Sequence, residues 1–157
     1  IYLSHFSGSH AVMRLDIDNP STPPGQLLDR LPHIQRLYWA DGLLLSLHFT
    51  PNSLMVHRVR KDGCVLLRMI PLRGEPYSLA RLGQGFLIAT AAELLWLDGE
   101  LRPRWSVDVP VLGGLRLATP SVTEAGDGFA WLKGQNADTL YKVTPASEKR
   151  PVAPNTG

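Results

Sequence analysis

Glycines recur at a fixed spacing along this sequence. Gly42, Gly85 and Gly128 each stand directly before an apolar run, and successive members of the set are 43 residues apart. The stretches around them read WADGLLLSLHFTPN, GFLIATAAELLWLDGE and AGDGFAWLKGQNAD. A fixed period of this length is typical of a repeated unit that cannot bury its own apolar faces and must stack on copies of itself. The chain is therefore predicted to be a stack of repeats.

Each unit is predicted to hold four short strands. In the second unit they are RLYWADG, LLLSLHFT, LMVHRVR and CVLLRMIPL, and in the third they are YSLARLGQG, FLIATA, LLWLD and LRPRWSVDV. Alternation of apolar and polar residues favours strands over helices. Asp-Gly turns at Asp62-Gly63 and Asp98-Gly99 support hairpins, because these residues tolerate the positive φ of tight turns. A unit of this length is typical of a four-stranded propeller blade.

The first and last units are expected to be incomplete. Counting one period back from Gly42 falls before Ile1, so IYLSHFS is expected to be the second strand of a unit without its first. That unit turns through DNPSTPPG, whose prolines exclude ladder pairing. The last unit has TLYKVTP as its third strand and then a polar tail. Residues 26–31 also fit one helical turn, but Pro32 disfavours a helix there, and we expect strand.

The predicted fold is all-β: a small four-bladed propeller-like ring of units of about 43 residues, incomplete or distorted. Residues 1–148 form one domain in this prediction, and residues 149–157 form a polar C-terminal tail. The tail either helps to close the ring or leaves it open. Because the axis of so small a ring is narrow, surface loops are the better candidates for a site.

The composition excludes several classes of function. The net charge is only +2, and the one basic cluster is Arg58 to Lys61, so no nucleic-acid surface is expected. No apolar run is long enough to span a bilayer. Cys64 is the single cysteine, so it forms no internal disulfide, and we expect a buried structural thiol. Ile1 in place of Met suggests that a segment was removed, and a cleaved export signal would explain it.

Catalytic and metal motifs are missing from the sequence. It has neither a G-x-S-x-G elbow nor an H-E-x-x-H helix, and no catalytic residue, cofactor or metal is expected. The histidines considered as ligands are expected to lie on blade surfaces and donate to backbone groups; they are His5, His10, His48 and His57. Most of the four tryptophans are expected in the core, except Trp105, whose neighbour Arg104 makes an interface hot spot the alternative.

Polar and glycine-bearing loops on one face are the predicted contact surface. In a propeller, the turns between second and third strands gather on one face with the connections between blades. Such loops suit contact with a protein better than catalysis. The predicted partner-binding residues are Ser7, Ser9, His10, Asn52, Ser53, Glu93, Trp105, Gly113, Gly114, Gln135, Asn136 and Asp138.

The whole chain, with units such as SHFSGSHAVMRLDIDNP and LLWLDGELRPRWSVDVP, resembles a known family. It is similar to small propeller-like periplasmic immunity proteins that protect bacteria from type VI secretion effectors, in particular peptidoglycan amidases. The likeness is one of size, repeat architecture, lone cysteine and missing catalytic set. It implies a non-enzymatic periplasmic inhibitor that places a loop in the cleft of a Cys/His amidase, so the partner would be a secreted cell-wall hydrolase.

Two other classes of function stay open. The chain is alternatively a periplasmic scaffold or assembly propeller that binds peptides by strand addition along an unpaired edge. A metal-dependent propeller hydrolase is the third class, and it would need acidic residues that converge near the axis. A stoichiometric metal ion in the purified protein would favour the hydrolase over the other two.

Overall fold

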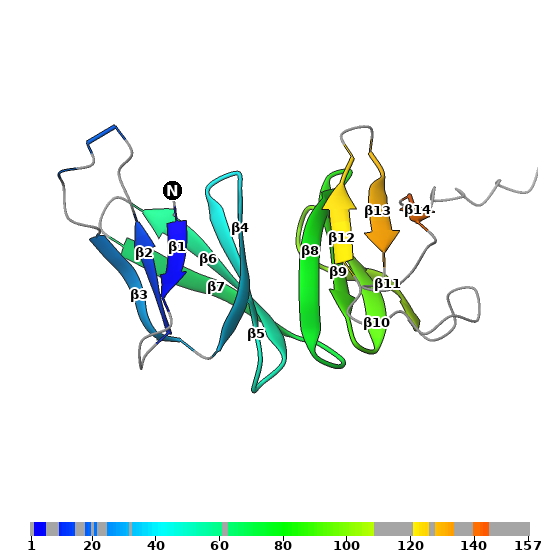
Figure 1. The fold of residues 1–157 in the computed structure, drawn as a ribbon, viewed down its shortest axis with the longest axis horizontal. Coiled ribbons are helices and arrows are strands. Elements are labelled where there is room, and N and C mark those ends of the chain that lie inside the picture. The colour runs from blue at the N-terminus through cyan, green and yellow to red at the C-terminus, as the bar shows by residue number, and fades with distance from the viewer. Residues whose placement is uncertain are drawn as a thin grey trace, which may run out of the picture.

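The fold is built from antiparallel strands (Figure 1). A computed structural model describes residues 2–5, 10–14, 18–19, 21, 25–31, 33–60, 63–108, 121–125, 128–133 and 140–144. Within these residues there are fourteen strands in four sheets, and no helix. It follows that no described helix is long and apolar enough to cross a membrane.

The first and last sheets have three described strands each. The first sheet has the order β1-β2-β3, with β1 at Tyr2–His5, β2 at His10–Arg14 and β3 at Gly25–Leu31. The last sheet has the order β12-β13-β14, with β12 at Ser121–Glu124, β13 at Ala130–Lys133 and β14 at Tyr141–Val143. The segment that also fitted a helical turn is strand β3.

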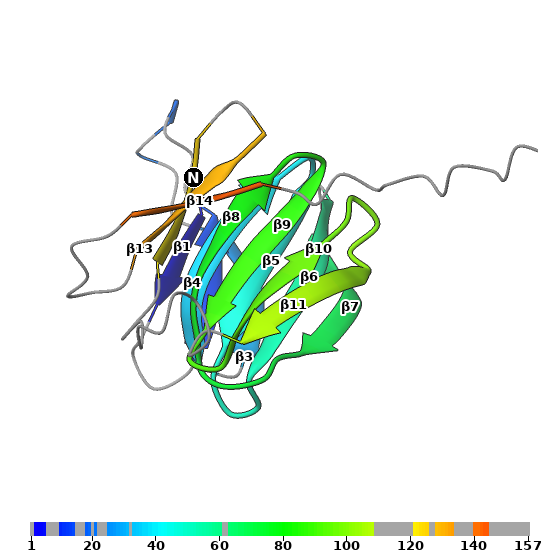
Figure 2. The ribbon, with the colours of Figure 1, turned by 90° about the vertical axis from the view of Figure 1, so that its right-hand side faces the viewer.

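The two middle sheets have four strands each, in chain order. The second sheet comprises β4 (Ile34–Ala40), β5 (Leu43–His48), β6 (Ser53–Arg60) and β7 (Gly63–Pro71). The third comprises β8 (Pro76–Leu82), β9 (Gly85–Thr90), β10 (Glu93–Leu97) and β11 (Pro103–Asp108), and Figure 2 shows these four side by side. The strands predicted for these two units are confirmed to within three residues at each end.

Two of the repeated glycines, Gly42 and Gly85, have different structural roles. Gly42 is the second residue of the Asp41-Gly42 turn, where φ is 49° and 78°, both in the left-handed region. Gly85 instead begins β9, directly opposite Leu82. A Cβ on Gly85 would collide with the carbonyl oxygen of Leu97 on β10. The common spacing in the sequence therefore reflects a turn in one unit and a close backbone approach in the next.

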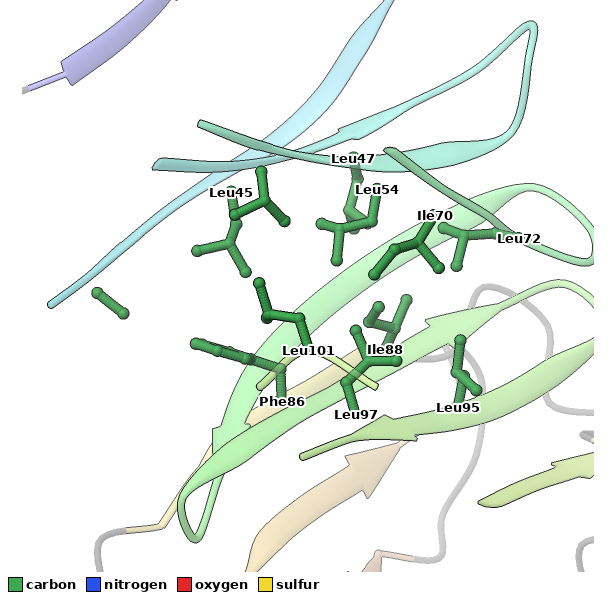
Figure 3. Close-up of a cluster of buried hydrophobic side chains, with 12 residues drawn as sticks. Leu45, Leu47, Leu54, Ile70, Leu72, Phe86, Ile88, Leu95, Leu97 and Leu101 are labelled. Atoms are coloured by element: carbon green, nitrogen blue, oxygen red, sulfur yellow. The ribbon is translucent and has the colours of Figure 1, made fainter. Parts of the chain in front are cut away.

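Successive sheets pack face to face through apolar side chains. Between the second and third sheets, Leu45, Leu47 and Leu54 meet Ile88 and Leu97 in the largest buried cluster (Figure 3). A second cluster joins the third sheet to the fourth, and a third cluster joins Val12 of β2 to the second sheet.

Strand β9 shows why the stack continues on both sides. Its six residues are all buried. Phe86 and Ile88 belong to the cluster shared with the second sheet, whereas Leu87 and Ala89 belong to the cluster shared with the fourth. Side chains alternate between the faces of a strand, so neither face of the third sheet can meet water without exposing this apolar surface.

Replacing Gly85 by alanine tests the close approach of β9 to β10. The added methyl group has no room beside the Leu97 carbonyl, so Gly85→Ala should destabilise the fold by about 1–3 kcal/mol or more. Gly25→Ala is the matched control, because a Cβ there meets nothing within 4 Å. Urea denaturation of both variants gives the comparison. Equal stability of the two variants would contradict this packing.

Candidate functional site

The structure describes part of the predicted contact surface. The side chains of Asn52, Ser53, Glu93 and Trp105 are described. His10 is the first residue of β2, but its side chain lies outside the described part. The other predicted residues also lie outside the described residues; they are Ser7, Ser9, Gly113, Gly114, Gln135, Asn136 and Asp138.

The turn between β5 and β6 is held at both ends by backbone hydrogen bonds. The Phe49 amide donates to the His33 carbonyl at 2.9 Å, and the Leu72 amide donates to the Asn52 carbonyl at 3.0 Å. The Ser53 hydroxyl is buried and donates to the Pro51 carbonyl at 3.1 Å. Ser53 therefore shapes this turn from inside, while Asn52 is half-buried and Pro51 is exposed.

Glu93 is likewise part of the interior. Its side chain is 5% exposed, and one carboxylate oxygen accepts a hydrogen bond from the Arg73 amide at 3.3 Å. The Arg73 guanidinium pairs with the other oxygen at 3.3 Å and also with Asp108. The Thr90 hydroxyl donates to the Arg73 carbonyl at 2.6 Å and accepts from the Glu93 amide at 2.9 Å. These bonds join the connection between two sheets to the β9–β10 turn, so Glu93 offers little surface to a partner.

Trp105 is half-buried against the third sheet. Its ring stacks on Trp96 with centroids 6.4 Å apart, and both rings pack on the second buried cluster. Trp39 and Trp131 are more exposed, at 44% and 36% of their surface. Trp39 and Trp131, which the sequence places in the core, are thus more exposed than Trp105, for which it offers an interface.

His48 and His57 lie between sheets rather than on a blade surface. Both are at least 97% buried, and His48 Nε2 is 2.7 Å from the Ser46 hydroxyl. His57 Nδ1 is buried without a described hydrogen-bond partner. Nowhere in the described ranges do three His, Cys, Asp or Glu side chains gather as metal ligands would. Cys64 is half-buried, and burial raises the pKa of its thiol, which disfavours the reactive thiolate.

The buried His57 predicts a stability that depends on pH. Burial, and then the nearby His48, lower the pKa of His57 below its ordinary value. The folded protein therefore binds a proton there less readily than the unfolded chain does. Stability should fall as the pH drops below about 6.5, until the lower folded pKa is passed.

His57→Leu should flatten this dependence. Urea denaturation between about pH 7 and pH 5 measures it, with His33→Gln as the control because His33 is exposed. A variant that keeps the full acid sensitivity of the native protein would show that His57 is not its source.

The outer strand of the second sheet carries the most continuous exposed apolar surface among the described residues. Strand β7 pairs with β6 along one edge and has no described strand on the other (Figure 2). Five consecutive residues of this strand, 65–69, are exposed. Four of them are apolar, with 42–53% of their surface exposed: Val65, Leu66, Leu67 and Met69.

Basic side chains of β6 flank this surface. We call the combined surface the β7 edge, and it comprises residues 65–69 together with Arg58 and Arg60. Arg58 stands opposite Val65, and Arg60 stands opposite Gly63 in the ladder. Both arginines are exposed. Arg68 turns instead to the third sheet, where it donates to the Leu101 carbonyl at 2.9 Å. The β7 edge therefore combines apolar side chains with positive charge.

Charged groups also meet near the first strands of the second, third and fourth sheets, and sequence reasoning missed them. The Tyr38 hydroxyl of β4 donates to Glu124 of β12 at 2.9 Å, and Arg81 of β8 pairs with Asp41 at 3.0 Å. Burial, and then the bond to Glu124, raise the pKa of Tyr38. A cavity of about 360 Å³ lies beside these pairs, next to Arg81, Glu124 and Phe129. Tyr38, Arg81 and Glu124 each lie near the end of the first strand of a different sheet, and this shared position was the one signal available in the sequence.

Comparisons with known proteins show a shared architecture. No protein-family model and no curated protein matches the sequence. The structure is similar to that of glutaminyl cyclase from Myxococcus xanthus, with a TM-score of 0.52 and 16% identity over 90% of this chain. It is also similar to the N-terminal domain of Nup159, with a TM-score of 0.57 and 14% identity over 92% of this chain.

The fold is β-propeller-like. Both similar structures are β-propellers, and one of them is an enzyme. At these identities the likeness concerns the fold alone. The chain spans 66% of the glutaminyl cyclase and 45% of the Nup159 domain.

Proposed function

We propose that this chain is a non-enzymatic protein-binding module built on a ring-like stack of four blades. The observation that carries the proposal is the β7 edge, a long outer strand with exposed apolar side chains. Natural proteins usually protect such an edge with charges, prolines or a covering segment, because its backbone groups pair readily with another chain. On β7 the apolar side chains are adjacent and exposed, so a partner that covers them gains hydrophobic stabilisation.

The partner we propose adds an extended segment to β7. Backbone hydrogen bonds along the edge would supply affinity, and side chains of alternating direction would supply specificity. Arg58 and Arg60 favour acidic residues in that segment. An exposed edge with this charge suits an apolar and acidic strand better than it suits a basic one.

Leu67→Lys tests the β7 edge. Leu67 lies where the ladder between β6 and β7 shifts register, and it is 46% exposed, so the fold should tolerate lysine. A lysine at position 67 should weaken binding of a purified partner at least about tenfold, because strand addition would remove its charged ammonium group from water. Val107→Lys is the matched control, on the outer strand of the third sheet with 39% exposure.

Hydrogen exchange on the complex supplies the second readout. The β7 amides should become protected when the partner binds, and those of β11 should not. Native affinity in Leu67→Lys, or unchanged β7 exchange in the complex, would exclude strand addition.

A second candidate is inhibition of a cell-wall amidase toxin in the periplasm, which the sequence resemblance suggests. The observation that favours it is the turn between β5 and β6, whose two ends are fixed by backbone hydrogen bonds with His33 and Leu72. A loop that is already ordered loses little entropy when it enters a cleft. In this candidate, Asn52 and its exposed neighbours would occupy the amidase cleft.

Asn52→Arg separates the two candidates. Titration of a purified peptidoglycan amidase effector from the same organism should show one-to-one inhibition by the native protein if the second candidate holds. Asn52→Arg should then abolish inhibition, because its side chain overfills the cleft, while Ser106→Arg on exposed β11 should inhibit normally. Loss of inhibition in Leu67→Lys with full inhibition by Asn52→Arg would assign the contact to the β7 edge instead.

A further inference from the structure

A second cavity lies where the first strands of three sheets come together. It has a volume of about 180 Å³ and is lined by residues of β4, β5, β8 and β12. Its lining combines apolar side chains with polar ones: the apolar residues are Leu37, Leu45, Leu47, Leu79 and Val122, and the polar residues are Arg36, Tyr38, Ser78 and Ser121. We call this space the axial cavity. It is distinct from the β7 edge, which lies at the outer end of the second sheet.

Hydrogen bonds between sheets hold the walls of the axial cavity in place. The Ser78 hydroxyl of β8 accepts from the Val122 amide of β12 at 2.9 Å. The bond from Tyr38 to Glu124 joins β4 to β12. Because each bond connects two different sheets, the cavity keeps its shape without an occupant, which lowers the cost of binding.

Arg36 gives the axial cavity a positive end. It is the only charged residue among the described residues that line the cavity. Its side chain is exposed, and its guanidinium makes one long contact of 3.4 Å with the Gln35 carbonyl. None of the ion pairs found among the described residues involves Arg36. Glu124 is held by Tyr38, and Arg81 is paired with Asp41.

The size of the axial cavity limits what it can hold. A water molecule takes up about 30 Å³ in the liquid, so the cavity has room for about six waters. Sites for drug-sized ligands are larger, from about 300 Å³ upward. A matching occupant has a short apolar body for the leucine walls and an anionic group for Arg36. The planar guanidinium suits a carboxylate, which it can bind through two parallel hydrogen bonds.

We propose that the axial cavity binds a small carboxylate with an apolar body, its carboxylate held by Arg36. Such a group occurs both in free short-chain acids and at the C-terminus of a peptide that ends in an apolar residue. This proposal does not depend on the β7 edge or on the amidase candidate.

Calorimetric titration with matched probes tests the charge requirement. Hexanoate should bind saturably, whereas hexanamide and pentylamine, which have the same five-carbon apolar chain, should bind at least about tenfold more weakly. N-acetyl-leucine and its amide repeat the comparison for a peptide C-terminus. Tighter binding of N-acetyl-leucine than of hexanoate assigns the site to peptide ends, and the reverse order assigns it to free acids. Absent binding of both acids, or equal binding of acid and amide, would overturn the proposal.

Variants then place the ligand. Arg36→Ala should weaken binding of the better acid at least about tenfold, and Arg36→Lys should retain part of it. Arg58→Ala is the matched control, since Arg58 is an exposed arginine of β6 outside the cavity. Ser121→Trp should weaken binding by filling the rim without removing the charge. Thermal melts confirm that each variant is folded. Native affinity in Arg36→Ala would overturn the assignment.

Discussion

The structure depends on strands that are buried on both faces. In β9, Phe86 and Ile88 pack against the second sheet while Leu87 and Ala89 pack against the fourth. A sheet with two apolar faces needs a neighbour on each side, and that need turns the repeated units into a stack. The Gly85 approach to the Leu97 carbonyl brings β9 close to β10 within the same sheet.

Burial of both faces of the middle sheets limits which surfaces can bind a partner or a ligand. The faces of the middle sheets are filled by packing, so the surfaces left for partners are outer edges, the turns and the space between first strands. The β7 edge is the outer edge with the most apolar surface among the described strands, and the axial cavity is the space where three sheets converge. A protein partner and a small carboxylate would therefore use separate parts of the molecule.

Much of the strand layout could be predicted from the sequence, because period and alternation act locally. The turn at Asp98-Gly99 and the β3 strand before Pro32 are examples. Burial of polar side chains could not be predicted in this way. Ser53 and Glu93 look like loop residues in the sequence, but their interactions with turn and connection backbones place them inside. His48 and His57 alternate with apolar residues as surface histidines would, yet another sheet covers them.

Native-state hydrogen exchange of the unbound protein tests the stack most directly. If burial on both faces holds the fold together, the amides of β5 and β9 open only with global unfolding and should exchange slowest. The outer strand β11, which is largely exposed, should exchange faster. Exchange in β9 as fast as in β11 would contradict the account, because the middle of the third sheet would then open without its neighbours.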